Sequence, residues 1–334
     1  MRFKLFLTNL LIVFSVFLIF STFFVSPGKA TAQSASSILI DLIPPNPSPF
    51  ENVTISLSSY ASNLDTVLIS WSVNGQNVSS GIGKKSLFTQ VPASGSEVAV
   101  VATISLPAGT VEKRVIIRPA VMVLLWQAND SYVPPFYRGK ALPTADSEVK
   151  VVAMPEIRLS AGGLVDPKNM TYAWKKDYTN NQEGSGYGKN FFIYTNDYLE
   201  NVNNISVTAQ TIDQGNSSAA NISIGTTQPK ISFYENDPDL GTIWEAALAN
   251  PHRISGNEIV VAVPYFISPK QIQNPRLVFS WFINGISVPI QSSRKNVMPL
   301  AVQAGTSGTS KLRLDIENKD KIFQSTSREI NMEF

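Results

Sequence analysis

Three segments of the chain alternate apolar and polar residues around a tryptophan, and each predicts a half-buried β-strand. In the first, Ile69, Trp71 and Val73 occupy every second position, so a strand places them on one face. Trp174 follows Trp71 by 103 residues, and Trp281 follows Trp174 by 107. A basic residue comes 13 to 15 positions after each tryptophan. The spacing predicts one small β-domain per tryptophan, with the tryptophans in the cores.

Two of the tryptophan strands end at an Asn-Gly pair. Asn74–Gly75 and Asn284–Gly285 fit the two central positions of a type I′ turn, where φ must be positive twice. Both strands are therefore expected to reverse into a hairpin. In the second repeat residues 177–181 replace the pair, which predicts a longer loop there.

The second and third repeats share an additional segment that the first lacks. Trp126 with Asn129–Asp130 is matched by Phe233 with Asn236–Asp237, and an excursion of about 20 residues follows in each. In the third repeat, residues 244–249 are expected to form one helical turn within it. The agreement indicates duplicated architecture.

The amino-terminal segment predicts export. Arg2 and Lys4 precede the apolar run 5–25, and Ala30–Ala32 supplies small residues for cleavage. Residues 1–32 are therefore interpreted as a signal peptide, with an uncleaved membrane anchor over residues 5–25 as the alternative. The rest of the chain is expected in the extracellular space or the cell envelope, and any membrane contact is expected only through this segment.

Cysteine content and charge exclude several functions. The chain has no cysteine, so it contains no disulfide, thiolate metal site or cysteine nucleophile. Its net charge of +2 includes Arg2, Lys4 and Lys29, and without these three the balance is 24 basic against 25 acidic residues. No basic surface of the kind that binds nucleic acid is predicted.

The strand tryptophans, the Asn-Gly pairs and the alternating segments 98–102, 205–209 and 312–316 resemble bacterial immunoglobulin-like domains of the polycystic-kidney-disease-like (PKD-like) type. Such domains are common in exported envelope proteins. The resemblance implies an all-β fold of three tandem β-sandwiches, over residues 33–118, 119–228 and 229–334. Short linkers near Arg118–Pro119 and Gln228–Pro229 favour a semi-rigid array. The family's usual Asp-Gly pair after the tryptophan is absent from all three repeats, so no cation site is transferred.

Reactive chemistry has few candidates in this sequence. His252 is the only histidine, and Asn250–Pro251 before it predicts a solvated loop. Asp130 and Glu148 recur as Asp237 and Glu258, which favours a repeated structural role over a pair of catalytic carboxylates. No catalytic residue and no cofactor is predicted.

Oxygen ligands gather at one point of the third repeat. Glu235, Asp237 and Asp239 surround Asn236, and these groups suit calcium. They are the only metal candidates, and they are weak ones because Asp130 lacks such neighbours in the second repeat.

Aromatic side chains mark the excursion of the second repeat. Tyr132, Phe136 and Tyr137 lie there with two prolines, a composition that suits contact with a protein or a sugar. The alternative is that Phe136 and Tyr137 cover their own sandwich.

The sequence thus predicts a non-enzymatic, exported cell-envelope protein. Its role is expected to be structural or protein-interacting, with envelope or surface proteins as partners. The alternative is a carbohydrate-binding or adhesive surface protein with glycan ligands, and the third hypothesis is a hydrolase.

Overall fold

The computed structural model describes residues 37–159, 162–290 and 293–334. The predicted signal peptide therefore lies outside the described residues. The described chain is an array of immunoglobulin-like β-sandwiches, which confirms the all-β prediction. Strands β1 to β7 form one compact unit, and β8 to β23 form a second. Within the described ranges, no helix is long and apolar enough to cross a membrane.

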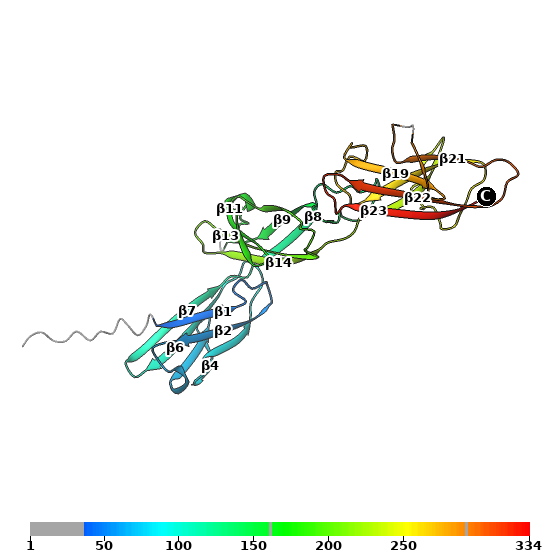
Figure 1. Ribbon diagram of the computed structural model, residues 1–334. Helices are drawn as coiled ribbons and strands as arrows, with labels where there is room; N and C mark the ends of the chain where they lie inside the picture. Colours follow the sequence, from blue (N-terminus) through cyan, green and yellow to red (C-terminus); the bar gives the residue numbers. More distant parts are fainter. Residues whose placement is uncertain (1–36, 160–161, 291–292) are drawn as a thin grey trace, which may run out of the picture. The chain divides into compact units, whose positions relative to one another are not determined.

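Each sandwich repeats one strand order, and Figure 1 shows its two layers. The first contains β1 (Ile38–Ile43), β2 (Asn52–Ser59), β3 (Leu68–Val73), β4 (Gln76–Ile82), β5 (Ser86–Gln90), β6 (Val98–Leu106) and β7 (Gly109–Ile117). The second contains β8 (Val121–Ala128), β9 (Glu148–Glu156), β10 (Met170–Lys176), β11 (Thr179–Tyr187), β12 (Phe191–Thr195), β13 (Val202–Thr211) and β14 (Ser217–Gly225). Short 3-10 helices precede the third strand of these two sandwiches, η2 (Leu64–Thr66) and η3 (Pro167–Asn169).

The third sandwich adds two short strands to the same plan. It contains β15 (Lys230–Asp237), β16 (Gly241–Thr242), β17 (His252–Arg253), β18 (Asn257–Tyr265), β19 (Leu277–Ile283), β20 (Ile286–Val288), β21 (Val297–Ala301), β22 (Thr309–Asn318) and β23 (Ser325–Glu333). Its sheets run β16-β15-β18-β21 and β17-β23-β22-β19-β20. The equivalent sheets of the second sandwich are β8-β9-β12 and β11-β10-β13-β14. The first, second and fifth main strands thus form one layer, and the other four form the facing layer.

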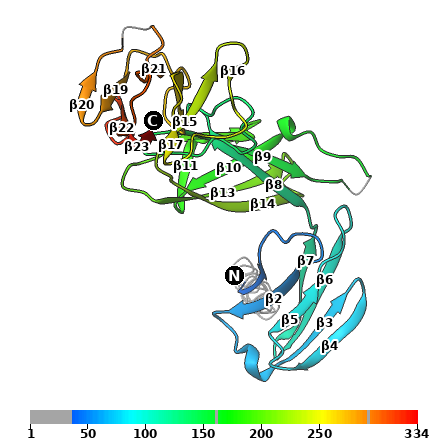
Figure 2. The ribbon, with the colours of Figure 1, turned by 90° about the vertical axis from the view of Figure 1, so that its right-hand side faces the viewer.

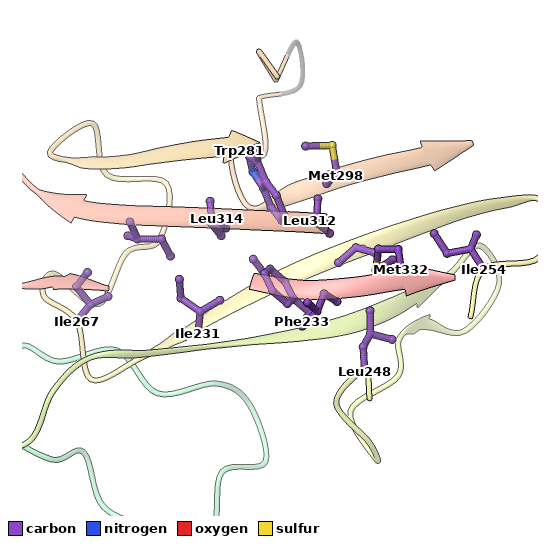
Figure 3. Packing of buried hydrophobic residues seen from close by; sticks show 14 of the residues in the cluster. Ile231, Phe233, Leu248, Ile254, Ile267, Trp281, Met298, Leu312, Leu314 and Met332 are labelled. Atoms are coloured by element: carbon purple, nitrogen blue, oxygen red, sulfur yellow. The ribbon is translucent and has the colours of Figure 1, made fainter. Parts of the chain in front are cut away.

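The tryptophans lie in the cores, on the third strand of each sandwich. Trp71, Trp174 and Trp281 are at most 1% exposed. Figure 3 shows Trp281 and Phe233 among the side chains that fill the space between the two layers, and their ring centroids are 5.8 Å apart. Burial of rings this large supplies much of the stability that disulfides would otherwise provide.

Each buried indole also makes one hydrogen bond between the two sheets. The indole N–H donates to the main-chain oxygen of the basic residue noted in the sequence, which is Lys84, Lys189 or Lys295, at 2.7, 2.9 and 2.9 Å. That lysine comes just before the fifth strand of its sandwich, in the sheet opposite the tryptophan. A buried N–H without a partner costs roughly 1–3 kcal/mol, so the spacing from tryptophan to lysine has a structural cause.

All three hairpins after the tryptophan strands have two-residue turns with positive φ. The angles are 50° and 83° at Asn74 and Gly75, and 50° and 81° at Asn284 and Gly285. Both φ values are positive, as in type I′ turns.

The longer loop predicted for the second sandwich is wrong. Asp177 and Tyr178 have φ of 48° and 68°, and Lys176 pairs directly with Thr179 across a two-residue turn. The carboxylate oxygen of Asp177 accepts from the N–H of Asn204 at 2.8 Å. Asn74 and Asn284 make the same bond to the start of their own sixth strands. Aspartate can replace asparagine because the bond shared by all three turns uses the side-chain oxygen as an acceptor. Asn284 also donates from its amide to the hydroxyl of Ser310 at 3.2 Å.

The helical turn predicted for residues 244–249 is also wrong. The segment contains only a turn at residues 244–245 and then runs without regular structure to residue 249. Its Trp244 packs on Tyr234, with ring centroids 5.4 Å apart. Packing of this ring on the sheet, rather than local helix propensity, determines the conformation.

We predict that Trp174→Phe destabilises the second sandwich by about 2–4 kcal/mol, because it removes packed volume and leaves the Lys189 carbonyl without its donor. Calorimetric unfolding measures the loss. Trp126→Phe is the control, since Trp126 lies in the same sandwich but is only partly buried. Equal losses for both variants would contradict the role given to the indole hydrogen bond.

A second prediction concerns pH. Burial alone would raise the pKa of Asp177, but bonds from the Asn204 N–H and the Lys176 ammonium outweigh it and hold the pKa below its usual range. The ionised carboxylate therefore adds stability above about pH 4, and this is lost as pH falls through the lowered pKa. Asp177→Asn should have a lower melting temperature than the natural chain at pH 7, and the difference should disappear as the pH falls through the lowered pKa of Asp177. A difference that persists at low pH would contradict this assignment.

Candidate functional site

The aromatic excursion of the second sandwich lies against the third sandwich. Tyr132 donates its main-chain N–H to the oxygen of Ile267 at 2.8 Å, and its own oxygen accepts from the N–H of Phe266 at 2.7 Å. Tyr137 makes edge contacts with the rings of Tyr265 and Phe266, at 5.8 and 5.9 Å between centroids. The excursion therefore covers the neighbouring sandwich, an arrangement that neither sequence alternative included.

A buried polar network completes this joint, as we name the contact region between the second and third sandwiches. Gln324 is fully buried, and its side chain accepts from the N–H of Ser268 at 2.8 Å and donates to the oxygen of Ala145 at 2.7 Å. The hydroxyl of Thr144, also fully buried, donates to the oxygen of Phe266 at 3.0 Å. Satisfied buried networks of this kind fix one relative placement of the groups that they join.

Two further contacts tie the rim of the joint. Asp130 forms an ion pair with Lys321. Tyr198 and Phe323 stack with their ring centroids 4.1 Å apart and their planes 9° from parallel. These contacts join loops of both sandwiches, so β8 to β23 form one compact unit.

The joint uses two of the three aromatic residues that were candidates for ligand contact. Tyr132 is partly buried against the core of the third sandwich, and burial raises the pKa of its hydroxyl. Tyr137 packs on Tyr265 and Phe266. Phe136 remains 84% exposed, with a φ of 62°. Of the three rings, only that of Phe136 is presented to solvent.

Of the three metal candidates, Asp237 has an internal role, whereas Glu235 and Asp239 are exposed. The side-chain oxygen of Asp237 accepts from the N–H groups of Leu240 and Asp239, each at 2.8 Å, and these bonds lower its pKa. Asp237 thus closes the turn that leads from β15 into β16. Among the described residues, no three acidic, histidine or cysteine side chains come together to hold a metal ion.

The recurring carboxylates are engaged in pairs. Glu148 accepts from the side chain of Asn129, and its N–H donates to Asp130 at 3.0 Å. In the third sandwich Glu258 lies 2.8 Å from Nε2 of His252.

The prediction that His252 lies in a solvated loop is wrong. Its side chain is 17% exposed and belongs to β17, which pairs in parallel with β23. His252 is held in place by the pairing of β17 with β23, and these two strands lie far apart in the sequence.

A surface that sequence reasoning missed is the outer face of the sheet β8-β9-β12 in the second sandwich. We call it the open face and define it by six apolar residues: Val123, Leu125, Val152, Met154, Phe191 and Ile193. Five of them are large side chains that are 41% to 54% exposed, and Val152 is partly buried. Strand register places Leu125, Val152 and Phe191 in one row across the sheet, with Val123 beside Met154. Figure 2 shows β8 and β9 side by side in this layer.

The equivalent face of the third sandwich is covered. Tyr234, Val261 and Val263 are at most 8% exposed there. Tyr132 of the preceding sandwich and Trp244 of the third sandwich's own excursion pack over them. Within the unit of β8 to β23, no excursion covers the open face in this way, although the ammonium of Lys150 lies over the ring of Phe191, 4.6 Å from its centroid. The open face is therefore a mainly apolar sheet surface without a covering segment in that unit.

The sequence did carry a signal for this surface. In β8 the run Val121–Trp126 is apolar at every position, and β12 reads Phe-Phe-Ile-Tyr-Thr. Continuous apolar strands are typical of sheets that are buried on both faces. A half-solvated strand would alternate, as Val53–Leu57 does in the first sandwich, where Thr54 and Ser56 point outward.

Comparison with known proteins adds only general likeness. No family model matches the chain, and no curated protein matches it. Fibronectin(III)-like modules of Clostridium thermocellum CbhA are 17% identical, covering 57% of this chain and 94% of theirs, with a TM-score of 0.28. The three N-terminal domains of the bacteriophage RB49 highly immunogenic outer capsid protein are 10% identical, covering 89% and 98%, with a TM-score of 0.24. The central fibronectin-III array of RIM-binding protein is 11% identical, covering 88% and 95%, with a TM-score of 0.31.

For the joint, we predict that Tyr137→Ala lowers the melting temperature of the second and third sandwiches and separates their unfolding into two transitions. Loss of the ring contacts should cost about 2–4 kcal/mol, and calorimetry measures it. Phe136→Ala is the matched control, because that ring is exposed and should change stability by less than about 0.5 kcal/mol. A single unchanged transition in Tyr137→Ala would contradict the rigid joint.

Proposed function

We propose that this chain is an exported, non-catalytic module of the cell envelope, with a structural and protein-interacting role. The open face is the observation that carries the proposal. Monomeric soluble proteins rarely leave a contiguous apolar surface of this kind exposed, and such surfaces usually bind other proteins. The face lies on the second sandwich, whose joint with the third supplies a rigid support.

The placement of charged residues favours a non-catalytic role. Asp130 and Glu148 hold the loop that leads into the joint, and Glu258 pairs with His252. Asp237 closes a turn. A typical glycoside hydrolase would need two carboxylates free to act on a substrate, and these four have structural partners instead.

A carbohydrate-binding role remains the second proposal, and it now depends on Phe136. Sugar sites usually present aromatic rings to stack on a ligand. Tyr132 and Tyr137 pack at the joint, so the exposed ring of Phe136 is the one that could contact a glycan from this excursion. A lone ring supports this role less well than the open face supports binding to a protein.

Export is supported by residues 1–32. The basic start, the apolar run 5–25 and the small residues Ala30–Ala32 have the order of a signal peptide. The absence of cysteine agrees with sandwiches whose stability comes from burial alone. We therefore place the partners among envelope or surface proteins.

Site-specific photo-cross-linking tests this function. We expect a photoreactive amino acid in place of Leu125 on the open face to form a covalent adduct with another protein in intact cells of the source organism. The same group in place of Asn221, an exposed position on β14, is the control and should give no specific adduct. Adducts at neither position, or equal adducts at both, would contradict the proposed role of the open face.

A further inference from the structure

Strand β12 forms a free edge of the open face. It is the outermost strand of the sheet β8-β9-β12, and its sequence Phe-Phe-Ile-Tyr-Thr contains no proline and no charge. A groove of about 370 Å³ separates it from β11 of the facing sheet and is lined by Phe191, Ile193 and Tyr187, among others. Edge strands are usually protected by proline, charge or a covering segment, and this one has none of these within its own sequence.

The unused hydrogen-bonding groups of β12 can be assigned from its register. Ala153 donates to the oxygen of Asn190 at one end of the strand, and Asn196 donates to the oxygen of Ser147 at the other, each at 2.8 Å. Antiparallel strands alternate between residues that bond to the neighbour and residues that point away. The main-chain N–H and C=O groups of residues 191, 193 and 195 therefore point away from β9, toward the free edge.

The third sandwich blocks the same position with proline. Its edge strand β21 has the equivalent end bonds, from Ala262 to the oxygen of Asn296 and from Val302 to the oxygen of Gly256. Counting from these bonds, Pro299 occupies the place of Ile193, because each lies three residues after the first bonded residue. Proline has no N–H to offer another strand. The chain thus closes this edge with proline in the third sandwich, whereas β12 has Ile193 and, by the same count, β5 of the first sandwich has Phe88.

We propose that a second copy of this chain occupies the free edge, and that the two β12 strands pair antiparallel about a two-fold axis at Ile193. In this register Ile193 faces Ile193 of the second copy, and Phe191 faces its Thr195. Residues 191, 193 and 195 of each strand then exchange their free main-chain bonds. Two-fold symmetric pairs are the commonest assemblies of soluble proteins, and a strand that pairs with itself meets the symmetry without further adjustment.

Charge favours this register. Pairing about Ile193 brings Lys189 opposite Asp197 of the second copy, because each lies four residues from the axis. Both residues are exposed and lie just outside the two ends of β12. In the single chain the Lys189 ammonium donates to the main-chain oxygen of Glu183, and a carboxylate oxygen of Asp197 accepts from the N–H of Leu199. The symmetry produces this attraction twice, once at each end of the paired strands. Opposite charges directly across antiparallel strands are stabilising, whereas like charges are destabilising.

Self-pairing would also enlarge the open face. A two-fold axis perpendicular to the sheet keeps both outer faces on the same side, so three strands from each copy join into one continuous sheet. Phe191 and Ile193 of both copies would then lie at its centre. The dimer would present one broad apolar surface to a further envelope protein. This role of the dimer rests on the proposed function.

Sedimentation equilibrium of the mature chain tests the pairing. We expect a reversible dimer at about 10–100 μM. Ile193→Pro should weaken it at least tenfold with little change in melting temperature, because the lost N–H points away from β9 and the third sandwich already has proline at this position. Thr195→Ser on the same strand is the control and should keep the dimer. A monomer throughout this range, or a dimer that Ile193→Pro leaves unchanged, would overturn the proposal.

Charge reversal tests the register. Lys189→Asp and Asp197→Lys should each weaken self-association about tenfold, since each variant places like charges opposite one another. A mixture of the two variants should restore association, because one chain then carries two acids and the other two bases. Failure of the mixture to associate better than either variant alone would overturn the register. A monomeric natural chain that still forms cellular adducts at position 125 would remove the dimer and leave the proposed function standing.

Discussion

The hydrogen bond from a buried indole to the lysine carbonyl across the sandwich is the constraint on which this architecture depends. A tryptophan on the third strand fills the core, and its N–H requires an acceptor where no water reaches. The acceptor comes from the residue before the fifth strand, in the opposite sheet, at 2.7 to 2.9 Å in all three sandwiches. Each sandwich thus has its two layers joined at the same point. A chain without cysteine depends on such a repeated internal link to define how its sheets pack.

The excursion between β8 and β9 explains how the second and third sandwiches differ. It crosses to the next sandwich, where Tyr132 helps to cover Val261 and Val263. Within the unit of β8 to β23, nothing makes the corresponding crossing onto the second sandwich, so its outer face remains apolar and exposed. The joint and the open face therefore both follow from one crossing loop, which covers the third sandwich and leaves the outer face of the second exposed.

Local sequence patterns predicted most of the strands and turns, because alternation and turn residues depend on interactions close in the sequence. Alternation around Trp71 and Trp281 indicates strands with one buried face, and the structure has both rings in the core. The longer loop predicted at Asp177 was wrong because the prediction treated an Asn-Gly pair as necessary for a two-residue turn. The turn needs only an acceptor oxygen and two positive φ angles. The prediction of a solvated loop at His252 was wrong because the environment of this residue depends on β23, about 80 residues away in the sequence.

The functional surfaces were harder to predict because they depend on which sandwich a loop reaches. Composition marked Tyr132 and Tyr137 as contact residues, but it could not show that the contact lies within the same chain. The open face has a clearer sequence signal, because β8 and β12 have apolar residues on both of their faces. This pattern predicts strands that are buried on both sides. Neither strand alone shows that the expected cover is missing.

Hydrogen exchange at individual amides of β12 distinguishes an open edge from a covered one. In the dilute single chain, we expect protection of the Phe192 and Tyr194 amides, which face β9, and rapid exchange at Ile193 and Thr195, which face the free edge. Raising the protein concentration should then protect Ile193 and Thr195 selectively. Slow exchange at Ile193 in the dilute chain, or rapid exchange there at every concentration and with every envelope partner, would contradict an open edge that binds another strand.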